Sequence, residues 1–218
     1  MITCTYTNDT LGGSSEENEA VKAKQELKEC FEVKVMPDIE HMLGIKVEKV
    51  TEEIRISQKA YALRTLEKFG MIDCKSKSTP LPVGLSLSTS DSPTNDEEIA
   101  EMRKVPYQEA LGSLMWLQVG THPDLSFSIN LLSCFASNPG RAHWEMLKHV
   151  LAYVKGTLDY GITYHWGASL QPVGFVDSDF TNDRDTQRST KGHVFYSGGG
   201  PVSWACYDRD TDAYCTRS

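Results

Sequence analysis

The chain has 218 residues, of which 39% are hydrophobic and 24% are charged, so it can form one or two small globular units with cores. This composition excludes a disordered tail. The net charge of -8 at neutral pH disfavours broad binding to a polyanion, so any groove for nucleic acid must be local.

The six cysteines show no C-x-x-C pair and no other tight spacing, which favours isolated, reduced thiols over a disulfide framework. The sequence also has no apolar run of 18 or more residues and no basic segment followed by an apolar signal-peptide core. We therefore expect no membrane partner. An intracellular product, or a piece cut from a larger one, fits this pattern, and the compartment stays open.

Residues 2–13 are predicted to form a β-hairpin. The segment 2–6 is rich in β-branched side chains, and the polar segment 7–10 has the composition of a turn. The motif Tyr-Thr-Asn-Asp places Asn8 beside Asp9 at the tip of the predicted hairpin. Both residues favour turns on their own, so an ordinary hairpin turn is one interpretation of the pair.

Three further elements are expected before residue 83. In chain order they are a helix capped by Ser14 or Ser15 with Val21, Leu27 and Phe31 facing inward, a β-hairpin from residues 41–50 and 53–56, and a helix capped by Ser57 and ended by Gly70. Lys59, Arg64 and Lys68 lie in the most basic neighbourhood of the chain and are candidate nucleic-acid contacts. A solvated charged face is the commoner explanation of such a pattern.

Residues 83–104 are rich in Pro, Ser, Thr and acidic side chains, and we expect them to form a flexible acidic linker. The linker would separate the preceding elements from the more apolar sequence that follows.

Residues 105–164 contain three consecutive helical patterns. The apolar faces are Tyr107, Ala110, Leu111, Leu114 and Leu117 in the first, Leu125, Ile129, Leu132 and Phe135 in the second, and Trp144, Leu147, Val150, Leu151 and Val154 in the third. Thr121 and Asp124 have the spacing of a capping box for the second helix. Phe127, Leu131 and Cys134 form a second apolar face there, which predicts burial on both sides. The third helix is expected to end before Gly156.

The C-terminal part is predicted to contain an antiparallel meander. Strand patterns cover residues 160–164, 170–176, 192–197 and 201–204, with a glycine-rich turn before the last. Asp177 and Asp179 follow the second of these strands. Carboxylates at a strand end are candidate metal ligands, and they are also common turn residues.

Three sequence motifs occur in order along the chain: YTND at Tyr6, YQEALGSLMWLQVGTHPDLSFSINLLSCFASNPGRAHWEMLKHVLAYVKGTLDYG from Tyr107, and GFVDSDF at Gly174. This arrangement resembles the polyproteins of copia-type retrotransposons, where reverse transcriptase joins RNase H. The resemblance implies an α+β fold. The implied parts are the end of the palm and start of the thumb (1–82), the acidic linker (83–104), a thumb and connection helical cluster (105–165) and an incomplete, truncated RNase H-like sheet (166–218).

In that family the hairpin word is Tyr-x-Asp-Asp, and its paired aspartates hold magnesium during DNA synthesis. The resemblance gives Asp9 this catalytic and metal-binding role, but Asn8 supplies a neutral amide in place of the other carboxylate. It likewise implies that Asp177 leads an RNase H-like carboxylate set, with Asp179 as a weaker ligand. An RNA-DNA hybrid or primed template and the remainder of the polyprotein are the implied partners.

We expect a fragment of an RNA-directed DNA polymerase and RNase H polyprotein that is catalytically inactive alone. After Trp204 the sequence lacks two motifs of the family, a basic motif and a Thr-Glu-Ala-Glu motif. A frameshift or a truncation would produce such a tail. Two alternatives stay open. One is a non-catalytic nucleic-acid-binding remnant, and the other is a protein-interaction module that pairs through exposed sheet edges.

Overall fold

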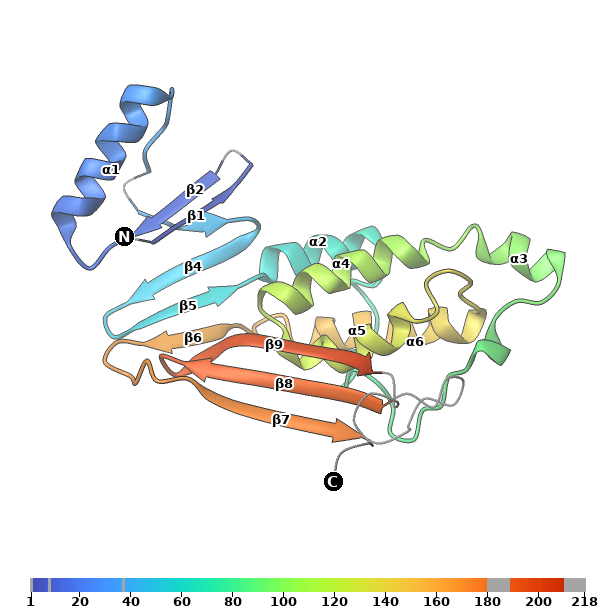
Figure 1. The fold of residues 1–218 in the computed structure, drawn as a ribbon. Helices are drawn as coiled ribbons and strands as arrows, with labels where there is room; N and C mark the ends of the chain where they lie inside the picture. Colours follow the sequence, from blue (N-terminus) through green and yellow to red (C-terminus); the bar gives the residue numbers. More distant parts are fainter. Residues whose placement is uncertain (1, 8, 37, 180–188, 210–218) are drawn as a thin grey trace. The chain divides into compact units, whose positions relative to one another are not determined.

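The computed structural model describes residues 2–7, 9–36, 38–179 and 189–209, and its α+β class agrees with the sequence prediction (Figure 1). The chain divides into two compact units, residues 1–43 and 44–218. The division of the sequence by ancestry into four parts stays a prediction, because compact units and ancestral parts are defined differently. None of the helices in the described ranges is long and apolar enough to cross a membrane.

The first unit contains the predicted N-terminal hairpin. Strands β1 (Ile2–Tyr6) and β2 (Asp9–Gly13) pair antiparallel, helix α1 (Glu17–Cys30) follows, and β3 (His41–Met42) ends the unit. The predicted cap of α1 is wrong, because the N-cap is Glu16 and Ser14 Oγ donates to Glu19 at 2.8 Å instead.

The predicted inner face of α1 is also not buried. Val21 is 55% exposed and Phe31 is 65% exposed, and α1 contains no buried residue. One hairpin and one short helix provide too little apolar surface to cover this face.

The second unit begins with a three-stranded arrangement in which β5 is central. Strands β4 (Ile45–Val50) and β5 (Glu53–Ser57) form the predicted hairpin, and β6 (Ile162–His165) pairs with the other edge of β5. Helix α2 (Lys59–Lys68) follows β5. Its N-cap is Gln58, so the predicted Ser57 cap is wrong by one position.

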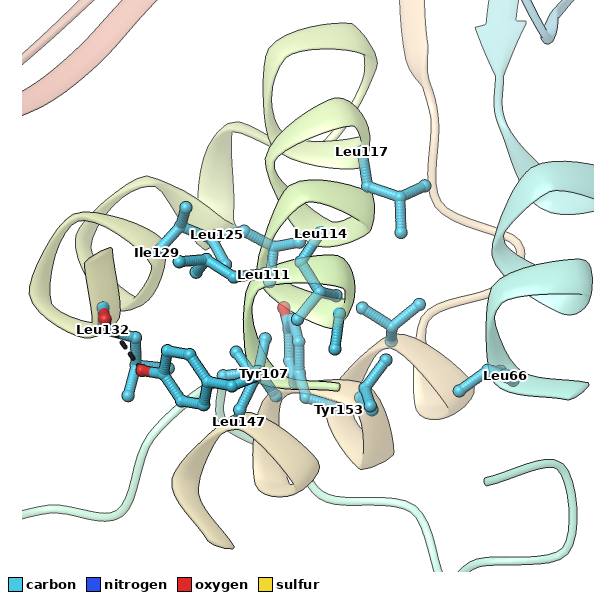
Figure 2. Packing of buried hydrophobic residues seen from close by; sticks show 14 of the residues in the cluster. Leu66, Tyr107, Leu111, Leu114, Leu117, Leu125, Ile129, Leu132, Leu147 and Tyr153 are labelled. Atoms are coloured by element: carbon cyan, nitrogen blue, oxygen red, sulfur yellow. Dashed lines mark hydrogen bonds between the residues drawn. The ribbon is translucent and has the colours of Figure 1, made fainter. Parts of the chain in front are cut away.

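The core of this unit lies among α2, α4 (Tyr107–Gly120), α5 (Ser126–Ser133) and α6 (Arg141–Gly156), as Figure 2 shows. The predicted inner faces of the first and third helices of the cluster are confirmed, since Leu114, Leu117, Leu147 and Leu151 are all 0% exposed. The hydroxyl of Tyr107 donates to the carbonyl oxygen of Leu132 at 2.8 Å and ties α4 to α5 inside the core.

The second helix of the cluster differs from its prediction. A 3-10 turn, η2 (Pro123–Leu125), precedes α5, and the N-cap of this turn is His122 without a side-chain cap bond. Thr121 Oγ1 does not cap the helix and instead donates to Gln58 Oε1 at 2.9 Å. The prediction that this helix is buried on both sides was also wrong, because Phe127 is 50% exposed and Cys134 is exposed.

The acidic range 83–104 contains two capped helical segments where a flexible linker was expected: the 3-10 turn η1 (Thr89–Asp91) and helix α3 (Asp96–Met102). Asn95 Oδ1 accepts from the backbone N–H of Glu98 at 2.8 Å. The acids of the first turn of α3 interact favourably with the positive end of the helix. A composition that resembles a linker is therefore also the composition of a capped helix start.

The C-terminal meander is confirmed as a three-stranded antiparallel sheet with the order β7 (Val173–Asp179), β8 (Ser189–Ser197) and β9 (Gly200–Arg209). The turn between β8 and β9 requires glycine, because Gly198 and Gly199 have φ angles of 62° and 86°. Figure 1 shows β9 on the side of the sheet nearest α5, where Trp204 Nε1 donates to the carbonyl oxygen of Gln118 at 2.8 Å.

The contact between η1 and the start of α6 provides a test of this fold. A Cβ added at Gly140 would overlap the backbone carbonyl oxygen of Asp91, whereas a Cβ at Gly112, in the middle of α4, meets nothing within 4 Å. We expect Gly140→Ala to lower the free energy of unfolding by about 1–3 kcal/mol and Gly112→Ala to leave it unchanged or raise it by up to about 1 kcal/mol. Urea denaturation followed by circular dichroism measures both. Equal stability of the two variants would contradict the docking of residues 89–91 on α6.

Candidate functional site

The hairpin tip holds one of the candidate metal ligands. Asp9 is the first residue of β2, is exposed, and lies opposite Tyr6 in the register of the hairpin. Asn8 lies outside the described residues, so only its chemistry can be considered. One carboxylate and one amide do not fit a two-magnesium centre, which needs several shared anionic oxygens.

The other candidate ligands lie at the end of β7. Asp177 is exposed, pairs with Gly192 in the register of the sheet, and accepts from the backbone N–H of Ser178 at 2.9 Å. The backbone of Asp179, two positions further along β7, pairs with Thr190. In the part of the chain that the structure describes, no group of three or more His, Cys, Asp or Glu residues could hold a metal ion.

The three candidate nucleic-acid contacts lie on α2 but do not form one strip. Lys59 and Lys68 are nine positions apart, which places them on roughly opposite sides of the helix. Lys59 Nζ lies 2.6 Å from Asp159 Oδ1, and Lys68 Nζ lies 2.6 Å from Glu109 Oε1. The hydrogen bond from Lys59 lowers the pKa of Asp159. Arg64 is exposed.

A polar cluster that the sequence analysis missed joins η2 to α6. The hydroxyl of Tyr153 donates to Asp124 Oδ2 at 2.7 Å, and His122 Nδ1 lies 3.4 Å from Asp124 Oδ1, a long separation for a hydrogen bond. His122 is 2% exposed and Tyr153 is 7% exposed. A buried tyrosine usually needs a hydrogen-bond partner, so the position of Tyr153 within the apolar third helix was the available signal.

The cluster stabilises the junction. Partial burial raises the pKa of Asp124, but the interactions with His122 and Tyr153 outweigh it, so the pKa of Asp124 lies below its usual value. Burial, followed by the nearby carboxylate of Asp124, raises the pKa of Tyr153. The arrangement therefore favours a carboxylate that accepts and a phenol that donates.

The lowered pKa of Asp124 makes stability depend on pH. Its contribution is present above the unfolded-state pKa, about 4, and is lost as pH falls through the lower folded-state pKa. We expect the stability difference between wild type and Asp124→Asn to shrink from pH 6 towards about pH 3. Urea unfolding across this range measures it, with the exposed Asp73→Asn as the control. A difference that stays constant with pH would contradict the assigned ionisation.

Comparison with known proteins identifies the chain. The family Reverse transcriptase (RNA-dependent DNA polymerase) matches residues 1–83. A retrovirus-related Pol polyprotein from transposon TNT 1-94 of Nicotiana tabacum is 36% identical over 94% of this chain, and one from transposon RE2 of Arabidopsis thaliana is 35% identical over 82%. An uncharacterized mitochondrial protein of Arabidopsis thaliana is 32% identical over 85% of this chain and 74% of its own length. No solved structure matches the chain significantly.

These matches define the class as retrotransposon reverse transcriptase. The chain belongs to the copia-type retrotransposon Pol polyproteins, as the sequence motifs predicted. It spans only 15% of the tobacco polyprotein and 12% of the RE2 polyprotein, so the chain corresponds to a small part of each.

Proposed function

We propose that this chain is a catalytically inactive part of a copia-type Pol polyprotein. The observation that carries the proposal is the amide residue Asn8, which precedes Asp9 in the sequence where the family has a carboxylate. An amide oxygen has only a partial negative charge, so it offsets the charge of two magnesium ions poorly. Asp9 is then the single carboxylate of the pair.

Each structural part has a proposed ancestral counterpart. The hairpin β1–β2 and the hairpin β4–β5 correspond to the end of the palm, and α2 corresponds to the start of the thumb, which the family match over residues 1–83 supports. Helices α4, α5 and α6 correspond to the thumb and connection. The meander β7–β9 corresponds to the first strands of an RNase H-like domain.

The proposed ligands follow from this ancestry. The ancestral enzyme would use magnesium, with Asp9 as a ligand in the polymerase motif and Asp177 and Asp179 as ligands in the RNase H-like motif. Its substrate would be an RNA-DNA hybrid or a primed template. Asp177 is exposed at a strand end with Oδ1 engaged by the backbone N–H of Ser178. We infer that such a carboxylate binds magnesium weakly, because chelation requires several converging oxygens.

A protein-interaction module is the second candidate, and strand β7 favours it. β7 is an edge strand in the described sheet, and its apolar residues Val173, Phe175 and Val176 are 54%, 60% and 73% exposed. An edge strand without lysine or proline can pair with another chain. The basic residues of α2 favour a nucleic-acid role less, because two of the three form ion pairs with Asp159 and Glu109.

Activity assays test the proposal. Extension of a primed RNA template and cleavage of a labelled RNA-DNA hybrid are measured in magnesium and in manganese. We expect no activity above background for the wild type, for Asn8→Asp or for Asp177→Asn. The substitution at residue 8 adds one carboxylate, whereas two-metal catalysis requires a set of carboxylates shared by both ions.

Two outcomes would overturn inactivity. Primer extension by the wild type would mean that the amide at residue 8 suffices. Hybrid cleavage by the wild type that disappears in Asp177→Asn would assign nuclease activity to the C-terminal sheet. Residual cleavage that is equal in both proteins would instead identify a contaminating nuclease.

A further inference from the structure

The two faces of the sheet β7–β8–β9 differ in composition. Residues that pair across antiparallel strands point to the same side, so the register assigns each side chain to a face. One face, called the outer face here, includes Gly174, Val176, Ser178, Ser189, Lys191, His193, Phe195, Ser203, Ala205 and Tyr207. The other face includes Phe175, Asp177, Val194 and Trp204.

The outer face points away from the helices of its unit. Trp204 belongs to the opposite face, and its indole nitrogen donates to the carbonyl oxygen of Gln118 in α4 at 2.8 Å. Gln118 Nε2 in turn donates to Ser126 Oγ at the start of α5. Because this face contacts the helices, the outer face is turned to solvent, where Val176 is 73% and Tyr207 is 44% exposed.

Three aromatic rings follow one another across the outer face. The ring centroids of Phe195 and His193 are 5.6 Å apart, and those of His193 and Tyr207 are 6.3 Å apart. Phe195 lies over Gly174 of the neighbouring strand, where an added Cβ would overlap its ring. The missing side chain at residue 174 therefore lets this ring lie down on the sheet while it stays 39% exposed.

The charge of the outer face also differs from that of the chain. The ten residues named for it include no carboxylate, although the whole chain has a net charge of -8. Lys191 provides a cation on this face. Asp177 lies on the opposite face, because side chains alternate along β7. A polyanion can therefore approach the outer face without meeting a carboxylate among the residues named for it.

We propose that the outer face binds single-stranded nucleic acid, with bases stacked on Phe195, His193 and Tyr207 and a phosphate near Lys191. Exposed aromatic rings on a sheet are a recurring platform for unpaired bases, since every base has a flat face that can stack. A duplex has its bases already stacked and would bind less tightly. This site goes beyond the proposed function, which assigns no ligand to this face.

The test is fluorescence anisotropy with labelled single strands of about twelve nucleotides, oligo-dT and oligo-U, and with a duplex of equal length. We expect the full chain to prefer the single strands, and Phe195→Ala and Tyr207→Ala each to lower affinity about fivefold or more. Phe175→Ala is the matched control, because Phe175 is an exposed aromatic residue on the opposite face of the same sheet. Tyr207→Phe keeps the ring and should keep the affinity.

Salt dependence and folding provide the second readout. Lys191→Gln should reduce the slope of log affinity against log salt by about 0.7, the loss of one phosphate contact to a single strand. Circular dichroism melting verifies that each variant is folded. No binding by the wild type at low salt overturns the proposal, as does equal loss in Phe175→Ala and Phe195→Ala. If the outer-face variants change self-association but not oligonucleotide affinity, the surface is a protein contact and the proposal is wrong.

Discussion

The second unit depends on the burial of one face of α6. Leu147, Val150, Leu151 and Val154 are all 0% exposed, and α2, α4, α5 and the turn η1 all contact this helix. A fully buried leucine or valine contributes about 1.5–3 kcal/mol relative to an exposed one, so these four side chains together outweigh any of the exposed ion pairs. Segments that are far apart in sequence are thereby held around one helix.

Polar groups inside this unit determine how the helices are placed around α6. Gln58 is 1% exposed, and its amide accepts from Thr121 and donates to the carbonyl oxygen of Trp116 at 3.3 Å. A buried amide without these partners would lose more than a typical hydrogen bond contributes. The end of β5 is therefore fixed against the C-terminal part of α4. A Cβ at Gly120 would overlap the amide of Gln58, so a larger residue there would force this buried side chain to move.

The sequence predicted what local periodicity determines and missed what long-range polar contacts determine. Apolar spacing located α4 and α6 and their buried faces, and turn residues located the hairpins. Thr121 looked like a cap because it precedes a helix, yet its hydroxyl bonds to Gln58, which is 63 positions away. For the candidate sites, motifs in the sequence predicted roles for Asp9 and Asp177, and these roles stay predictions. The partners of Lys59 and Lys68 come from distant segments that no local pattern specifies.

The distribution of burial explains how the family of this chain can stay recognisable in its sequence when exposed side chains are replaced. The buried face of α6 and its neighbours maintain the fold, whereas Asp9 and Asp177 lie on exposed strands and contribute nothing to the core. Replacing an exposed carboxylate usually changes stability by less than about 0.5 kcal/mol, while truncating a core leucine costs about 2–5 kcal/mol. Under the proposed function, an amide at residue 8 in place of a metal-binding carboxylate is therefore compatible with a folded chain, and the fold imposes no physical penalty that would restore the carboxylate.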